Sequence, residues 1–390
     1  MSFLQQLFGG GGSVHTPYGG GVLWSGGYST DSGSSVSEWN APTIPAVYAC
    51  VGIISDAIAQ LPVKVYRDSN GRREHMTGHP VERLLNERPN PRMTAFSFRK
   101  TQISHTLLWG NGYAHVQRLG SGEPAGLWLS LPDRTQPVLL EDGTLVYRTT
   151  IENEQEVFEA PEMVHLPAYS FDGVVGYSPV AVARQAMGLA KAQEAFGARL
   201  YGNDQKSGGF IKHPGRLSEE AQRNLKESLE RQGGPDNSHK LKILEEGMDF
   251  VQTTINPEDA QFLEGRSFQV AEIARIYRVP LHMIQEVSGS TSWGSGLSEM
   301  SMGFVRFTLA PWITPIEQEW KAKLFTERER REGYYVKHDT SDLLRGSLTD
   351  RSDYYTAALN PETGWLTREE VRASEDKDPL DGDAGFERIE

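Results

Sequence analysis

The side chains best suited to catalysis or metal binding are spread along the chain and do not gather into a motif. Of the ten histidines, only His75 and His79 lie four residues apart. Pro80 follows directly, which is not the helical setting in which such a pair can share a metal ion. Asp381 and Asp383 form an acid pair, but they lie in an acidic run that could not position a substrate. We therefore predict no metal site and no general acid–base pair.

Motifs for nucleotide binding and nucleophilic catalysis are also missing from the sequence. It contains no Gly-Lys-Ser or Gly-Lys-Thr, no GxSxG and no HExxH. The run 110–112, Gly-Asn-Gly, lacks the rest of a dinucleotide fingerprint and stands between an expected helix and an expected strand, which is the wrong order. The single cysteine, Cys50, lies in an apolar run and is expected to be a buried, inert thiol. We expect no catalytic residue, no cofactor and no enzymatic activity.

The charge balance excludes several classes of protein. Lys and Arg number 39 against 52 Asp and Glu, a net charge of −13. A protein that coats nucleic acid needs clustered basic residues, so this class is excluded, whereas a protein that nucleic acid merely passes is not. Mean hydropathy is −0.48, and no apolar stretch approaches the ~18–20 residues of a membrane span. With one cysteine the chain can form no internal disulfide, as expected for a reducing compartment.

Both ends of the chain are less globular in composition than its middle. Residues 1–36 hold ten glycines and one charged residue, Asp31. Such a segment buries too little apolar surface to offset its ordering entropy, so a floppy tail is expected. The alternative is an arm that orders against a neighbouring subunit. Residues 348–390 carry an excess of acidic over basic side chains and are expected to form a short helical piece followed by a solvated acidic tail.

The first half of the chain alternates between helical and strand patterns. Apolar residues at helical spacing predict a helix over 44–61, which Pro62 ends. Helices are also expected over 80–86 and over 94–109, the latter with Thr94 as its N-cap. Short alternating runs between 112 and 158, separated by turns, predict a small and mostly antiparallel β unit. The expected fold class is therefore α+β.

Two long helices flank a compact insert in the second half. Ser178-Pro179 is a typical helix start, and small residues continue the first helix to about 203, close to 40 Å at ~1.5 Å per residue. An electrically neutral insert follows over about 205–256, and a second long helix is expected over 257–277. A Gly/Ser loop then precedes a helix from 297 or 298 to about 332. Pro311 and Pro315 predict a kink in that last helix near 310–315.

Several of these segments resemble, in the same order, the portal proteins of long-tailed phages. The similar stretches span about 41–374 and are GYSP at 176–179, GFIKHPGRLSEEAQRNLKESLE and KLKILEEGMDF in the insert, PEDAQFLEGR at 257–266, AEIARIYRVPLHMI at 271–284, FTLAPWITPIEQEW at 307–320 and LTREEVRASE at 366–375. No single stretch is very specific, but their joint order is a strong signal.

The resemblance implies an α+β portal fold with a mixed α/β wing, paired stem helices, an α/β clip, a kinked tunnel helix and a helical crown. It implies this layout: a flexible arm at 1–40, the wing at 41–176, stem helix 1 at 177–204, the clip at 205–256, stem helix 2 at 257–285, the tunnel loop at 286–297, the tunnel helix and wing return at 298–347, and the crown at 348–390.

The same resemblance implies a structural role without covalent chemistry. A homo-oligomeric ring, expected to be a dodecamer, would surround a channel for double-stranded DNA at the capsid portal vertex. The implied partners are the terminase large subunit, the head–tail connector or adaptor, the major capsid protein and the scaffold. The implied location is the virion, and the host cytoplasm during assembly. No membrane, cofactor or metal ion is implied.

Three groups of site residues follow from the resemblance. The DNA-facing tunnel loop would comprise Ser288, Gly289, Ser290, Thr291, Ser292, Trp293, Gly294 and Ser295. Motor docking at the clip would use Lys206, Lys212, Arg216, Glu219, Glu220 and Arg223. The kink of the tunnel helix would lie at Pro311 and Pro315.

Two other classes of function remain as alternatives. One is an enzyme whose active site is assembled from distant residues, with the Gly/Ser loop serving as a lid. A pair of small-residue helices around a neutral insert is of little use to a monomeric enzyme, which disfavours this hypothesis. The other is a monomeric adaptor that binds DNA ends, and the net charge of −13 argues against it.

Overall fold

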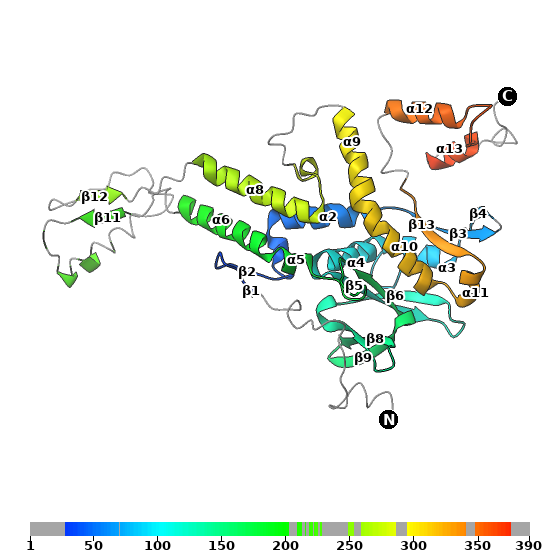
Figure 1. Cartoon of the computed structure of the whole chain (residues 1–390), viewed down its shortest axis with the longest axis horizontal. Coiled ribbons are helices and arrows are strands. Elements are labelled where there is room, and N and C mark those ends of the chain that lie inside the picture. The colour runs from blue at the N-terminus through cyan, green and yellow to red at the C-terminus, as the bar shows by residue number, and fades with distance from the viewer. Residues whose placement is uncertain are drawn as a thin grey trace.

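A computed structural model shows an elongated α+β chain in which short antiparallel sheets pack on helices and a helical hairpin projects to one side (Figure 1). It describes residues 28–69, 71–202, 209–212, 215, 218–220, 222–224, 227, 249–252, 259–285, 295–340 and 348–375. We call residues 41–176 together with 295–340 the body, because they contain most of the buried core. The expected α+β class is confirmed.

One sheet of the body joins segments from opposite ends of the sequence. Its order is β13-β3-β4, and the strands are β3 (Val63–Ser69), β4 (Arg72–His75) and β13 (Tyr334–His338). Val65 and Val336 are register partners in the antiparallel β3–β13 pair, and both are buried. Alternation along β3 places its valines in the core and its polar residues outward, as expected for a half-buried strand.

The strands between 111 and 167 form two sheets and not the single β unit that was expected. One has the order β10-β5-β6 and the other β7-β8-β9. Their bounds are β5 (Asn111–Arg118), β6 (Pro124–Ser130), β7 (Thr135–Leu139), β8 (Leu145–Ile151), β9 (Glu154–Glu159) and β10 (Met163–Pro167). The antiparallel pairing is confirmed. Strand β10 was not predicted, because its five residues, Met-Val-His-Leu-Pro, show no alternation of apolar and polar side chains.

Helices α3 (Pro80–Asn86) and α4 (Ala95–Trp109) pack on strands of these sheets, and α2 (Pro45–Ala59) packs on α4. All three were predicted within two residues. Thr94 is the N-cap of α4, where its side chain accepts a hydrogen bond from the Ser97 amide, as predicted. Cys50 is buried in α2, and burial raises the pKa of its thiol to about 12, so it is inert as expected.

The projecting hairpin consists of α6 (Arg184–Gly202) and α8 (Asp259–Tyr277), which pack side by side (Figure 1). A single long helix from Ser178 was expected. The chain instead forms one short helix, α5 (Pro179–Val182), and breaks at Ala183, where φ is −94° and ψ is 10°. Ser178 is the N-cap of α5, as predicted. Between the long helices, β11 (Gly209–Lys212) pairs antiparallel with β12 (Asp249–Gln252).

The helical run after residue 294 contains a local change of helix type. Helix α9 (Ser295–Phe304) continues into the π-helical turn η6 (Val305–Leu309) and then into α10 (Ala310–Leu324). The expected end near 332 is wrong. The run stops at Leu324 because Thr326 and Glu329 form a capping box that starts a separate helix, α11 (Glu327–Arg331).

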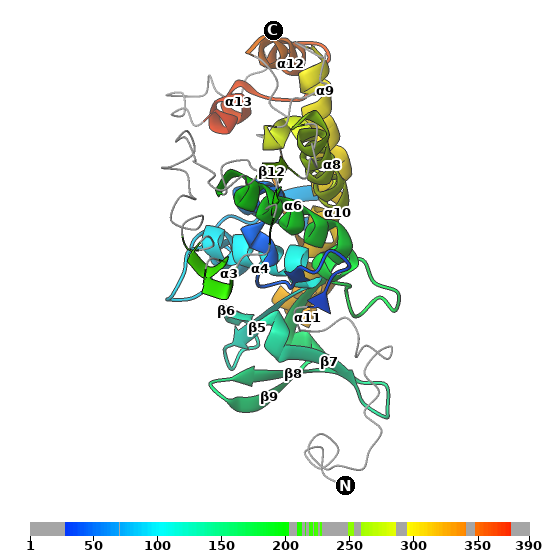
Figure 2. The ribbon, with the colours of Figure 1, turned by 90° about the vertical axis from the view of Figure 1, so that its left-hand side faces the viewer.

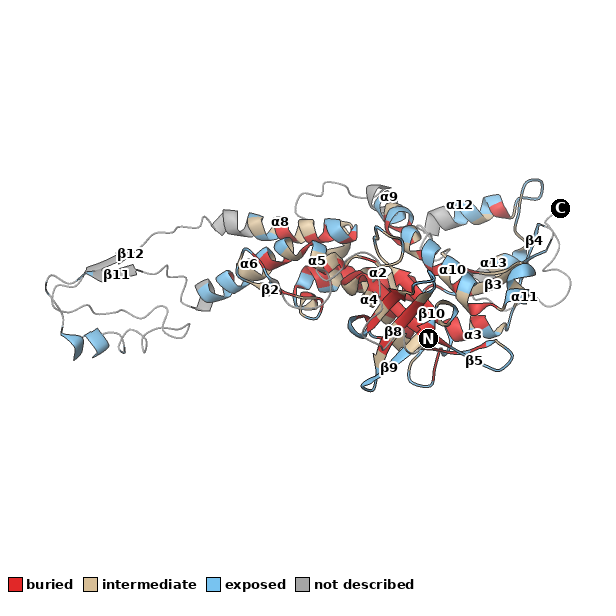
Figure 3. Ribbon diagram, turned by 60° about the horizontal axis from the view of Figure 1, so that its bottom comes forward, coloured by how far each residue is buried: buried red, intermediate tan, exposed pale blue. Residues whose placement is uncertain are grey.

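The remaining elements lie around this frame. The hairpin β1 (Tyr28–Ser29) and β2 (Ser35–Val36) lies against α6. The short helices are η1 (Ala41–Thr43), η2 (Pro132–Arg134), η3 (Ala160–Glu162) and η5 (Leu281–Ile284). Helices α12 (Leu348–Ala358) and α13 (Arg368–Ser374) lie at the end opposite β8 and β9 (Figure 2). Buried residues concentrate in the body, and exposed ones follow the hairpin outward (Figure 3).

Candidate functional site

The joint between the body and the hairpin is built on one buried amide, that of Asn111 at the start of β5. Its Oδ1 accepts from the Gly176 amide at 2.9 Å, and its Nδ2 donates to the Gly176 carbonyl at 2.8 Å. These two bonds fix the orientation of the amide. Asn111 is 1% exposed, so its side chain replaces water for the amide and the carbonyl of Gly176, three residues before helix α5 begins.

His165 on β10 continues this polar network. Because Asn111 Oδ1 can only accept, the contact of 2.9 Å requires His165 Nε2 to donate. Nδ1 then accepts from the Tyr147 hydroxyl at 3.2 Å. Burial, together with the nearby Lys323 ammonium, lowers the pKa of His165 to about 3. The imidazole is therefore neutral in the folded protein at any physiological pH, and it links β5, β8 and β10.

Two glycines allow the backbones at this joint to touch. Gly110 has φ +80° and ends α4, and a Cβ there would lie 2.7 Å from the Ser178 amide nitrogen. A Cβ on Gly176 would lie 2.6 Å from the Ala168 nitrogen and still closer to the Gly110 carbonyl oxygen. The Ser178 hydroxyl donates to the Leu108 carbonyl at 2.8 Å. The start of α5 is thus attached to the end of α4 without intervening side chains.

A second buried network attaches α10 to β13 through Glu317. One carboxylate oxygen accepts from the His338 amide at 2.8 Å, and the other contacts Lys337 Nζ at 2.5 Å. Burial opposes ionisation of Glu317, but the hydrogen bonds from His338 and Lys337 outweigh it and hold the pKa of the carboxyl below its ordinary value. The His338 ring also stacks on Trp320. This network fixes the helical run 295–324 to the sheet.

Replacing Glu317 by Gln should lower the free energy of unfolding by about 1–3 kcal/mol, because the amide cannot satisfy both the His338 amide and the Lys337 ammonium. The matched control is Glu327→Gln, which removes the exposed ion pair with Arg331 and should cost less than about 1 kcal/mol. Urea unfolding of both variants tests the difference. Equal losses would show that Glu317 does not fasten α10 to β13.

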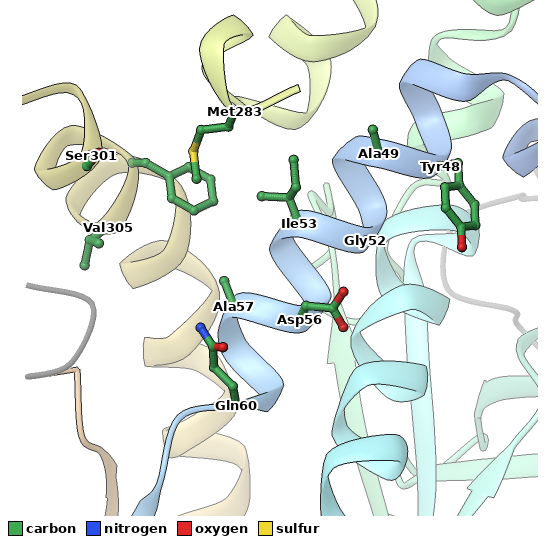
Figure 4. Close-up of a pocket in the computed structure, with 11 residues that line it drawn as sticks. Tyr48, Ala49, Gly52, Ile53, Asp56, Ala57, Gln60, Met283, Ser301 and Val305 are labelled. Atoms are coloured by element: carbon green, nitrogen blue, oxygen red, sulfur yellow. The ribbon is translucent and has the colours of Figure 1, made fainter. Parts of the chain in front are cut away.

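An open groove of about 500 Å³ lies between α2 and the end of α9, where η6 begins (Figure 4). Ala49, Gly52 and Ile53 line one wall, and Met283 and Phe304 line the other. The charged group at its edge, Asp56, is paired with Lys100 at 2.6 Å. The lining is mostly apolar and brings together no acid, base and nucleophile, so the groove offers surface for packing and no catalytic chemistry.

The predicted tunnel-loop residues 288–294 lie outside the described residues. Ser295 is the first residue of α9, so the helix begins two or three residues before the expected start. On the other side, η5 ends at Ile284 and is followed by Gln285, which has φ +61°. Among the predicted clip residues, Lys206 and Arg216 also fall outside the described part.

The described clip residues are all exposed. Lys212 ends β11, where its register partner is Asp249. Glu219 and Glu220 lie in a helical stretch, as the sequence predicted, and Arg223 follows one turn later. Their role in docking a partner stays a prediction.

The predicted kink residues occupy two different positions in α10. Pro311 lies in its first turn, directly after η6, and Pro315 lies inside the helix. The Ala310 amide bonds to the Val305 carbonyl, an i→i−5 contact of the π type. Pro311 has no amide hydrogen and so cannot continue the i→i−4 hydrogen bonds of an α-helix. This missing hydrogen is a local cause for the change of helix type at this point. The bend itself stays a prediction.

Sequence reasoning missed the residues that hold the joint together. Asn111 was considered only as part of a Gly-Asn-Gly turn, and His165 was not singled out. The available signal was two short motifs that contain glycine, 110–112 after an expected helix end and 176–179 at an expected helix start. Their pairing could not be seen because 65 residues separate Asn111 from Gly176.

Metal and membrane features were searched over the described ranges. There, no group of three or more His, Cys, Asp and Glu side chains is arranged to hold a metal ion. Within the same ranges, none of the helices has both the length and the apolar character needed to cross a membrane.

Solved structures share this fold. The neck of a native gene transfer agent particle, computed with C12 symmetry, superposes with a TM-score of 0.58 at 23% identity over 88% of this chain and 93% of that one. An HK97-family phage portal protein from Corynebacterium diphtheriae gives a TM-score of 0.59 at 17% identity, covering 79% of this chain and 98% of that one. At these identities the likeness concerns the fold alone.

Sequence comparisons identify the family. The chain is 33% identical to the portal protein of Enterobacteria phage HK97, over 95% of this chain and 88% of the relative. It is 31% identical to a probable portal protein of Streptomyces phage phiC31, over 97% and 86%. The family model for phage portal proteins matches residues 45–376. This chain therefore belongs to the phage portal protein family.

Proposed function

We propose that this chain, a portal protein of a tailed phage, forms a closed ring at the capsid vertex through which double-stranded DNA is packaged and ejected. The observation that carries the proposal is the α6–α8 hairpin, which projects from the body with a β11–β12 insert at its far end (Figure 1). A rotational ring arises when unlike surfaces of neighbouring subunits meet and the rotation closes. Twelve subunits are proposed, in line with the C12 symmetry of the gene transfer agent neck.

In this proposal each part of the chain has one position in the ring. The body, including the strands from 111 to 167, is the wing, and α5, α6 and α8 form the stem. Residues 205–256 are the clip, which docks the terminase large subunit and later the head–tail connector. Residues 286–297 are the tunnel loop, and 348–390 are the crown. The major capsid protein and scaffold would contact the wing, in the virion and earlier in the host cytoplasm.

The net charge suits a channel that DNA passes through. An excess of acidic groups repels phosphate, so DNA is not held at the wall. The proposed tunnel loop carries one formal charge, that of Glu286, in a run of Ser and Gly. No cofactor and no covalent step are needed, because the proposed mechanism is geometric.

Electron microscopy and light scattering on the purified full chain test the ring. We expect rings with a central hole and a mass near twelve times 43.4 kDa. If the chain is a monomer in dilute solution, capsid and scaffold proteins are added to the sample, because some rings assemble only with them. A monomer or dimer that persists at high concentration with these partners present would overturn the proposal.

A further inference from the structure

The groove between α2 and the end of α9 is an apolar surface that the described residues leave open (Figure 4). Most of the α2 residues that line it are half-buried, and a Cβ on Gly52 would meet no atom within 4 Å. Met283 of η5 and Phe304 of α9 line the opposite wall. Its volume of about 500 Å³ lies within the range of roughly 300–1,000 Å³ that is usual for ligand pockets. The groove is therefore large enough to hold bulky side chains of a partner.

The helical run that forms one wall of the groove carries an exposed aromatic residue on another side. Phe304 and Val305 line the groove and are buried, whereas Phe307 does not line it and is 65% exposed. Arg306 is also exposed, and its guanidinium carbon lies 5.4 Å from the centroid of the Phe307 ring. This contact is a cation–π interaction, so the two side chains form one surface feature. We call Arg306 and Phe307 the knob.

The knob lies within the π-helical turn η6, which is fastened to the rest of the chain. Val305, Thr308 and Leu309 of this turn are buried. The Thr308 hydroxyl donates to the Arg278 carbonyl just after α8, at 2.6 Å. Single π turns are rare and are found most often at functional sites. Because the turn that carries the knob is held in place, docking of the knob costs little conformational entropy.

The knob and the groove are complementary in charge as well as in apolar character. Asp56 is the one charged residue among those that line the groove, and its side chain is 47% exposed. It pairs with Lys100 at 2.6 Å, but a carboxylate has two oxygens and can accept from a second cation. Within the part of the chain that the structure describes, no acidic side chain pairs with Arg306. The knob thus offers a cation and an aromatic ring, and the groove offers an anion and an apolar wall.

We propose that the knob of one subunit docks into the groove of the next subunit, with Phe307 in the apolar part and Arg306 against Asp56. The partner is a second copy of this chain, because the knob and the groove lie on different sides of one helical run and the knob does not fill its own groove. Contacts between two such unlike surfaces repeat from copy to copy and close into a ring when the rotation allows it. The inference rests on the proposed ring and names one of its subunit contacts.

Disulfide capture in assembled rings of the full chain tests the proposal. Phe307→Cys is combined with Gly52→Cys, and the native Cys50 is buried and unreactive. A disulfide needs Cα atoms about 4.4–6.8 Å apart, so it reports contact. The matched control is Phe307→Cys with Gly120→Cys, because a Cβ on Gly120 also meets no atom within 4 Å but lies away from the groove. We expect crosslinking about tenfold or more faster at position 52 than at 120, since docking raises the effective concentration of the pair.

The size of the crosslinked product shows whether the contact joins two subunits. The expected product is a reducible ladder of multiples of 43.4 kDa. A product of monomer size would mean that the knob reaches the groove of its own subunit, and it would overturn the proposal. Equal rates at positions 52 and 120 in well-formed rings would also overturn the proposal and leave the ring intact. A parent chain that forms no rings, even with capsid and scaffold proteins, would count against the ring itself.

A second pair of cysteines covers the case in which Phe307→Cys prevents ring formation. Arg306→Cys with Asp56→Cys then reports the same contact, and the same ladder is expected. In this pair, adding Phe307→Ser should slow crosslinking about tenfold, because a polar side chain does not fill the apolar groove, whereas Phe307→Leu should leave the rate within about twofold. Equal rates for the Ser and Leu variants would show that Phe307 does not dock there.

Discussion

Replacing Gly176 by Ala is expected to lower the free energy of unfolding by at least about 4 kcal/mol, the range reached only by severe core changes. The added methyl group would overlap the Gly110 carbonyl oxygen and approach the Ala168 nitrogen at 2.6 Å. Both obstacles are backbone atoms, which cannot rotate away. The overlap can be relieved only if the end of α4 moves away from the start of α5. This movement breaks the two hydrogen bonds between the Asn111 side chain and the backbone of Gly176.

The same exchange at Gly173 is the matched control. Gly173 lies three residues earlier in the same loop and has φ +77°, but a Cβ there meets no atom within 4 Å. Backbone strain alone should cost about 1 kcal/mol. Urea unfolding at equal protein concentration compares the two variants, since assembly makes apparent stability depend on concentration. If Gly176→Ala were no less stable than Gly173→Ala, the close approach of the two backbones would not hold the joint.

Lowering the pH from 7 to 4.5 is expected to destabilise the chain by about 3 kcal/mol through His165 alone, because each pKa unit of difference is worth about 1.4 kcal/mol. The pKa of His165 is lowered from an ordinary value near 6.5 to about 3 by burial and the nearby Lys323. The folded state thus binds the proton less readily than the unfolded state. The contribution is fully present above pH 6.5 and is lost progressively as the pH falls toward 3.

A variant isolates this contribution from the other titrating groups. His165→Gln keeps a side chain that can hydrogen-bond to Asn111 but does not titrate. It should be less stable than the parent at pH 7 and should lose about 3 kcal/mol less between pH 7 and 4.5. Urea unfolding across this pH range gives both slopes. Parallel slopes for parent and variant would mean that His165 does not remain neutral in the folded protein.

The local sequence determined most of the helices and strands of this protein. Thr94 and Ser178 marked helix starts because a hydroxyl before the first turn satisfies an amide that has no partner within the helix. Pro62 marked a helix end because proline has no amide hydrogen with which to continue a helix. Motif order was sufficient to identify the family, since it depends only on the chain itself.

Only the tertiary structure decided which of these elements meet. The valines of β3 could be predicted to be buried, but not that they pair with β13, some 270 residues later. Strand β10 was missed because its pairing with β5 is what makes it a strand. Nothing in the local sequence around Asn111, His165 or Gly176 likewise indicates that these residues are buried and joined in one hydrogen-bond network. The partner of a strand and the burial of a polar side chain depend on contacts between distant segments, and no pattern within one segment encodes them.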